Sequence, residues 1–145
     1  MYHPKPDIGQ VEKDLEFIEL KNTGADTLNL KTLVLFGGAQ FVFSSDLKVA
    51  PNEFVVLVSD SNVFHQRYPS VKVGGEFTSN FANSGEEFYI KAGNDTLINI
   101  EYGDDLPWSP LADGKGFSLV SNDVNPVGKQ DKSNDWKNSC AVNGS

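Results

Sequence analysis

The chain has few of the residues that most catalytic and metal sites require. Its 145 residues include one cysteine, one methionine and two histidines. The single cysteine, Cys140, cannot close an intramolecular disulfide. Two histidines and one cysteine also fall short of the nitrogen and sulfur ligands that a structural zinc site uses. His3 and His65 belong to no evident Ser-His-Asp set, so the sequence predicts a protein that is not an enzyme.

Basic residues are also scarce. Twelve Lys and Arg stand against twenty Asp and Glu, which gives a formal net charge of −8. Proteins that bind nucleic acid gain most of their affinity from cations that neutralise phosphates. An acidic chain is repelled at long range by DNA and by anionic lipid. Nucleic-acid binding is therefore the third and least favoured hypothesis.

Long apolar runs are absent as well. No run approaches the roughly 18 apolar residues of a transmembrane helix, so we expect no membrane span in this segment. Residues Met1–Pro4 lack the basic and apolar stretches of a signal peptide. The chain is then either cytosolic or a domain of a longer exported protein. The abrupt ending at Gly144-Ser145 favours the second interpretation, with a location outside the cell, on its surface or in the periplasm.

Apolar and turn-forming residues are plentiful. Hydrophobic residues make up 39% of the chain and include ten Phe, while thirteen Gly and seven Pro punctuate it. Branched and aromatic side chains suit a half-buried pleated sheet, and frequent Gly and Pro mark many turns. We expect one all-β domain over residues 15–140. Residues 1–14 would form an arm or a first edge strand, and residues 141–145 the C-terminal end.

Periodicity supports this division into strands. An alternating pattern places Ile18 and Leu20 on one face of a predicted strand, and Phe17, Glu19 and Lys21 on the other. Such a pattern is typical of a sheet with one face on the core and one in solvent.

One helix and one hairpin are also predicted. A short helix near residues 62–68 would be capped by Asp60 or Ser61 and stopped by Pro69. Gly93-Asn94-Asp95 separates two apolar runs and indicates a tight hairpin. The whole pattern predicts an antiparallel β-sandwich of roughly seven to nine strands.

Three segments carry a family resemblance. They are Glu16–Asn22, Asn83-Ser84-Gly85-Glu86 and the stretch from Pro107-Trp108 to Gly116. In this order, over about residues 10–140, the chain resembles the bacterial form of the lamin tail domain. The positions that match the family motifs are Glu16, Glu19, Asn22, Asn83, Gly85, Glu86, Trp108, Gly114 and Gly116.

The resemblance implies an immunoglobulin-like β-sandwich without catalytic residues. In bacteria such domains are accessory modules of large exported or surface proteins, which implies a protein partner or a neighbouring domain of the same chain. In animal nuclei they bind proteins and sometimes DNA, but the net charge of −8 departs from a DNA-binding surface.

Two motifs raise the question of catalysis. Glu19 could act as a general base only beside a partner of suitable pKa. We expect instead that Glu16 and Glu19 occupy outward or edge positions or bond to a loop amide. Ser84 lacks the glycine on each side that a nucleophile elbow needs, so Asn83-Ser84-Gly85 is interpreted as a structural turn.

Two ligand hypotheses stay open. Asp104, Asp105 and Asp113 flank one loop, and their oxygens suit Ca²⁺, although the spacing fits no EF-hand. The aromatic residues Tyr102, Trp108 and Trp136 suggest sugar stacking, and the alternative for Trp108 is packing across the mouth of the sandwich. A carbohydrate- or calcium-dependent adhesion module is thus the second hypothesis. Exposed edge strands would also allow a dimer.

Overall fold

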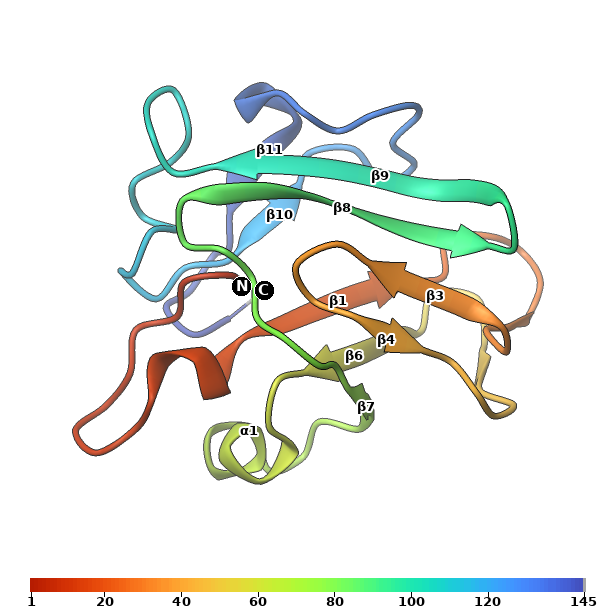
Figure 1. The fold of residues 1–145 in the computed structure, drawn as a ribbon, viewed down its shortest axis with the longest axis horizontal. Coiled ribbons are helices and arrows are strands. Elements are labelled where there is room, and N and C mark those ends of the chain that lie inside the picture. The colour runs from red at the N-terminus through yellow and green to blue at the C-terminus, as the bar shows by residue number, and fades with distance from the viewer. Residues whose placement is uncertain (145) are drawn as a thin grey trace.

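The computed structural model describes residues 1–144, which form eleven strands and one α-helix (Figure 1). The strands are β1 (Phe17–Lys21), β2 (Leu28–Asn29), β3 (Leu33–Phe36), β4 (Phe41–Val42), β5 (Lys48–Val49), β6 (Phe54–Val58), β7 (Val73–Glu76), β8 (Gly85–Ala92), β9 (Asp95–Gly103), β10 (Leu119–Ser121) and β11 (Trp136–Asn138). The helices are α1 (Ser61–Arg67) and two 3₁₀ turns, Glu12–Leu15 and Ser133–Asp135. The prediction of an all-β, sandwich-like fold is confirmed.

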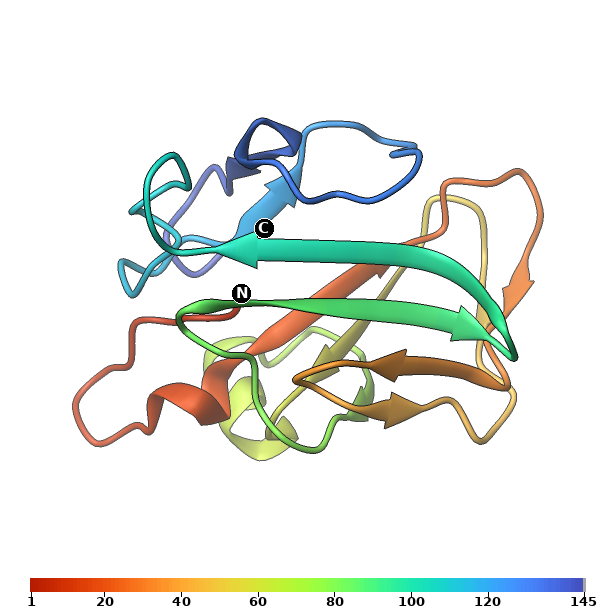
Figure 2. The same cartoon turned by 45° about the horizontal axis from the view of Figure 1, so that its top comes forward.

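Two larger sheets and two small ones build the domain. The four-stranded sheet has the order β4-β3-β8-β9, and the three-stranded sheet has the order β1-β6-β7. The pairs β2–β5 and β10–β11 are separate. Figure 2 shows β10 and β11 beyond β9, with α1 on the opposite side of the molecule. Strands β1 and β9 therefore each end a sheet.

The strand pattern differs from the prediction in two respects. Strand β6 pairs with β7 in parallel, because α1 carries the chain back to the starting side of the sheet. All other strand pairs of the described residues are antiparallel. Eleven strands replace the expected seven to nine, because β2, β4 and β5 are two-residue ladders. Ladders this short carry no periodicity that a sequence pattern could reveal.

The predicted helix is confirmed as α1. The carboxylate of Asp60 accepts hydrogen bonds from the backbone N–H groups of Asn62 and Val63, at 2.8 and 3.0 Å. It thus provides an acceptor for two N–H groups that have no partner within the first turn of the helix. The helix buries Phe64 against Phe17, with the ring centroids 5.7 Å apart. This contact belongs to a second hydrophobic cluster that fastens α1 to the outer face of the three-stranded sheet.

The main core lies between the two larger sheets. Leu35, Phe88 and Ile90 of the four-stranded sheet meet Val55 and Leu57 of the three-stranded sheet, and all five side chains are buried. The alternation predicted for β1 is also confirmed, since Ile18 and Leu20 pack against this cluster while Phe17 joins the cluster beneath α1. The predicted hairpin joins β8 to β9, and Gly93 adopts a φ of +58° at its turn.

The N-terminal arm is an integral part of the fold. Tyr2 is buried, with its ring centroid 4.4 Å from that of Tyr102. His3 forms a parallel bridge with Asp113, which ties the arm to the loop that follows β9. Of the expected C-terminal end, residues 141–145, Ser145 lies outside the described residues. Within residues 1–144 no helix has the length and apolar character to cross a membrane.

Candidate binding cleft

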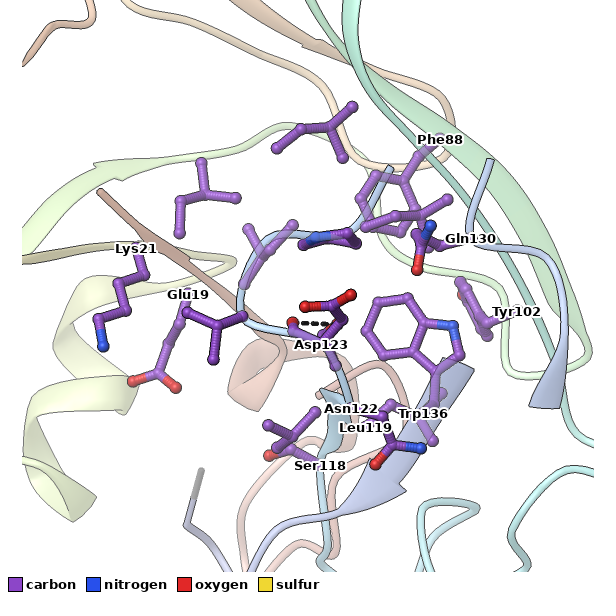
Figure 3. A pocket seen from close by; sticks show the side chains of 18 of the residues that line it. Glu19, Lys21, Phe88, Tyr102, Ser118, Leu119, Asn122, Asp123, Gln130 and Trp136 are labelled. Atoms are coloured by element: carbon purple, nitrogen blue, oxygen red, sulfur yellow. Dashed lines mark hydrogen bonds between the residues drawn. The ribbon is translucent and has the colours of Figure 1, made fainter. Parts of the chain in front are cut away.

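A cleft of about 780 Å³ lies between β1 and β9, the facing edge strands of the two larger sheets (Figure 3). Strand β1 forms one wall, β9 forms the other, and the β10–β11 pair with residues 121–130 covers them. This volume falls in the range of roughly 300–1,000 Å³ that is common for ligand sites. The cleft exists because the core of the sandwich is closed at this end by a small separate sheet rather than by direct pairing of β1 and β9.

The floor of the cleft is apolar. It is made by inward-facing side chains of β1, β9 and β10, namely Ile18, Leu20, Ile98, Ile100 and Leu119. All of them pack against the main core, so the cleft is an open extension of that core. Apolar surface in contact with water is unfavourable, so an apolar group that covers this floor would be stabilised.

The rim of the cleft is also apolar. Phe54 and Leu97 border the cleft and are 58% and 56% exposed. Val124 and Val127, on the covering loop, are 67% and 93% exposed. Single exposed apolar side chains are common, but four around one cleft form a patch, and such patches mark binding surfaces.

Polar groups border the cleft at defined places. Glu19 and Lys21 project from β1 on the face opposite Ile18 and Leu20, Asp123 projects from the covering loop, and Gln130 and Trp136 stand on the opposite side (Figure 3). The indole Nε1 of Trp136 is buried and has no hydrogen-bond partner among residues 1–144. A buried N–H without an acceptor costs free energy.

The edge of β1 that faces the cleft has free backbone groups. The carbonyl of Glu16 and the N–H of Asn22 bond to residues flanking β6, so the even-numbered residues of β1 pair with that strand. The backbone groups of Phe17, Glu19 and Lys21 therefore point the other way. Phe17 pairs with Met1, but within the described part of the chain Glu19 and Lys21 have no partner on this side.

The covering loop is tied to β9. The backbone of Gln130 accepts from Glu101 N–H at 3.1 Å and donates to the carbonyl of Asn99 at 3.0 Å. The ammonium group of Lys129 bridges Glu87, at 2.8 Å, and Glu101. Hydrogen bonds to these two carboxylates raise the pKa of Lys129, and the bond to Lys129 is the main cause of a lowered pKa for Glu87. These contacts keep the loop over the cleft.

Glu16 and Glu86 bind loop amides outside the cleft. Glu16 is 2% exposed, and its carboxylate accepts from Phe81 N–H at 2.8 Å and from the Asn80 side chain at 3.3 Å. Burial raises the pKa of Glu16 to about 7, against the opposing effect of these hydrogen bonds. Glu86 accepts from Ala82 N–H at 2.8 Å. Both acids brace the segment between β7 and β8, which is a structural role.

The asparagine and glycine motif positions also build turns. The side chain of Asn22 is buried, donates to the carbonyls of Asp26 and Val49, and accepts from Gly24 N–H. Asn83 donates to Glu12 at 2.8 Å. Gly85 has a φ of +95°, and a β-carbon there would lie 2.4 Å from the carbonyl oxygen of Tyr102. The structure places a turn here, with Ser84 at an exposed position.

The loop between β9 and β10 is held by the packing of Trp108 and by contacts of His3. Trp108 is partly buried against the main core, and its ring closes over Gly103, so the packing alternative for Trp108 is confirmed. His3 Nδ1 lies 2.5 Å from Asp113 Oδ1, and its Nε2 lies 3.2 Å from a Glu12 oxygen. Gly114 adopts a φ of +68° beside His3, and Gly116 adopts a φ of +89° beside Val142.

The three aspartates proposed for calcium do not form a site in the structure. Among residues 1–144 no group of three or more His, Cys, Asp or Glu side chains is placed to hold a metal ion. Asp104, Asp105 and Asp113 are therefore not gathered as one ligand set, and the carboxylate of Asp113 bonds to His3. Tyr102 is buried, so Tyr102, Trp108 and Trp136 form no shared exposed stacking surface.

Sequence reasoning missed the cleft itself. Its covering residues Asp123, Gln130 and Trp136 come from a polar C-terminal stretch that resembles a loop. The available signal was the presence of Val124, Val127 and Trp136 as isolated apolar residues in that stretch. Only the tertiary structure shows that they line one cleft together with β1.

Neither protein-family models nor curated proteins yield a match to this chain. The resemblance to the lamin tail domain therefore rests on the motif residues alone.

Proposed function

We propose that this domain is a non-catalytic interaction module that binds an extended segment of a partner protein or of a neighbouring domain. The observation that carries the proposal is the free edge of β1, where Glu19 and Lys21 present unpaired backbone groups beside an apolar cleft. An extended peptide satisfies both features at once. Its main chain pairs with the edge, and its alternate side chains enter the cleft.

The placement of the acidic motif residues supports a role without catalysis. Glu16 and Glu86 each accept a hydrogen bond from a loop amide, and Asp113 pairs with His3. Each of these three carboxylates is thus used in a contact that holds a loop or the N-terminal arm. None of the three stands beside a nucleophile in the cleft.

We further propose that the domain belongs to the lamin tail family, with the immunoglobulin-like version of the sandwich, and serves as an accessory module of a larger exported bacterial protein. The order of the motif segments and the all-β, sandwich-like fold support this assignment. The free edge of β1 fits such a role, because a module between other domains needs a surface that a neighbour can join.

Selection from a random displayed peptide library tests the interaction hypothesis. Selected peptides are expected to bind the domain in solution and to shift the amide resonances of Glu19 and Lys21. Replacing Lys21 with proline removes an N–H that faces the cleft, so the same peptides should bind at least tenfold more weakly. Failure to enrich any peptide, or binding unchanged by Lys21→Pro, would refute the proposal.

A second candidate is carbohydrate binding. Trp136 stands at the wall of the cleft with Asp123 and Gln130 nearby, and a ring with neighbouring hydrogen-bonding side chains is suited to a sugar (Figure 3). A glycan array with and without EDTA tests this alternative and its calcium-dependent form. A hit that is lost in Trp136→Ala but retained in Lys21→Pro would favour sugar over peptide.

A further inference from the structure

We infer that the β1 edge selects one order of side chains in its partner: acidic, apolar, basic, apolar, read from N to C. This inference rests on the proposed function and specifies the partner segment. It follows from the direction of strand addition, from the faces of β1 and from the charges of Glu19 and Lys21.

The direction is set by a contact that already occupies one end of the edge. Met1 N donates to Phe17 O at 2.8 Å, and Phe17 N donates to Met1 O at 3.2 Å. Two residues whose backbone N–H groups each donate to the other's carbonyl form an antiparallel pair. We infer that an incoming strand continues this antiparallel pairing, so that it passes Lys21, Leu20, Glu19 and Ile18 in turn and ends before the position opposite Phe17, which Met1 fills.

The faces of β1 assign each position of the incoming strand. Residues directly opposite one another across a strand pair project to the same face. Partner residues opposite Leu20 and Ile18 therefore point into the cleft, toward Ile98, Ile100 and Leu119. These two positions require apolar side chains, because the floor they cover is apolar.

The remaining positions face two opposite charges. Lys21 is exposed and sits over the ring of Phe54 at 5.3 Å, and Glu19 lies one step along the same face of β1. Opposite charges across a strand pair are favourable and like charges are unfavourable. The residue opposite Lys21 should therefore be acidic, and the residue opposite Glu19 should be basic.

A second copy of this chain meets the order only in part. Two β1 strands paired about a twofold axis at Glu19 would place like charges directly opposite each other, which destabilises a pair. An axis at Leu20 sets Glu19 of each copy opposite Lys21 of the other, but it brings Asn22 opposite Ile18, where the order requires an apolar side chain, and the Asn22 side chain already bonds to the carbonyls of Asp26 and Val49. A dimer through β1 is thus a competing outcome of the test rather than the expected one.

Two peptides of identical composition test the order directly. The matching probe is acetyl-Thr-Glu-Val-Lys-Val-amide, and its control, acetyl-Thr-Lys-Val-Glu-Val-amide, exchanges only the two charges. Both probes end opposite Ile18, because Met1 already pairs with Phe17. Titration followed by NMR should show the matching probe binding about three- to tenfold more tightly at low salt. The preference should reverse for the double variant Glu19→Lys/Lys21→Glu, whose folding is checked by its melting temperature.

Methylation of single peptide nitrogens tests the backbone pairing. The probe's lysine, opposite Glu19, should donate its N–H to β1, whereas the N–H of either valine points away. N-methylation of that lysine should abolish binding, and N-methylation of the first valine should leave it nearly unchanged. Equal loss from both modifications would overturn the predicted register.

The outcomes separate this inference from the proposed function. Equal binding of the two peptides, with resonance shifts at Glu19 and Lys21, overturns the charge order and leaves strand addition in place. Failure of both peptides, while library peptides of another order bind in a manner sensitive to Lys21→Pro, also overturns only the order. Failure of every peptide, or occupation of the edge by a dimer in sedimentation, overturns both.

Discussion

The carboxylate of Glu16 accepts a hydrogen bond of 2.8 Å from the backbone N–H of Phe81, a residue 65 positions later in the chain. This bond joins the start of β1 to the segment between β7 and β8, and Asn80 donates a second bond to the same carboxylate. Burial nonetheless dominates the proton affinity and raises the pKa of Glu16 to about 7, from an ordinary value of 4.5.

This raised pKa predicts a pH dependence of stability. Below pH 4.5 the carboxyl is protonated in both the folded and the unfolded chain, so it imposes no charge-burial cost. Between pH 4.5 and 7 the unfolded chain loses the proton first, so the free energy of unfolding falls as pH rises, by up to about 3 kcal/mol from this group. Urea unfolding at pH 5 and at pH 7.5 measures the change.

The matched control is Glu16→Gln, which keeps an oxygen that accepts from Phe81 N–H but cannot titrate. The variant should lose this part of the pH dependence, while the contribution of all other groups cancels in the comparison. Equal pH profiles for the two proteins would show that Glu16 titrates normally in the fold.

Gly85 and Gly93 allow a matched test of how closely the backbone packs around a glycine of positive φ. Gly85→Ala should lower the free energy of unfolding by at least about 2 kcal/mol more than Gly93→Ala. Both glycines have positive φ, but a β-carbon at Gly85 meets the Tyr102 carbonyl at 2.4 Å, whereas one at Gly93 meets nothing within 4 Å. Denaturant unfolding of the two variants gives the comparison, and similar losses would contradict the close approach at Gly85.

The free edge of β1 predicts different effects of proline at adjacent positions. Lys21→Pro removes an N–H without a partner among the described residues and should cost less than about 1.5 kcal/mol of stability. Leu20→Pro removes an N–H that faces β6 and should cost about 3 kcal/mol or more. Thermal unfolding followed by circular dichroism tests this. The reverse order would place the free edge on the other side of β1.

The attachment of α1 depends on Phe64. Phe64 is 3% exposed and packs on Phe17, so Phe64→Ala should destabilise the domain by about 3–5 kcal/mol. Gln66→Ala, at an exposed position of the same helix, should change stability by less than about 0.5 kcal/mol. Comparable effects of the two substitutions in urea unfolding would show that α1 is not held through Phe64.

Local patterns in the sequence predicted local structure well. The alternation around Ile18 and Leu20 identified β1 and its inward face, Asp60 and Pro69 bounded α1, and Gly93-Asn94 marked the β8–β9 hairpin. Each of these signals depends on residues only a few positions apart. Of the alternatives expected for Glu16, the structure shows the bond to a loop amide, which comes from Phe81.

Contacts between distant segments could not be predicted from such local patterns. The parallel pairing of β6 with β7, the burial of Tyr2 against Tyr102 and the cleft between β1 and Trp136 each join parts of the chain that no local periodicity connects. The sequence by itself determined an all-β domain with a short helix, because propensity and alternation act over neighbouring residues. Only the tertiary structure decided which edge stays open, because that depends on which distant strands compete for the same backbone groups.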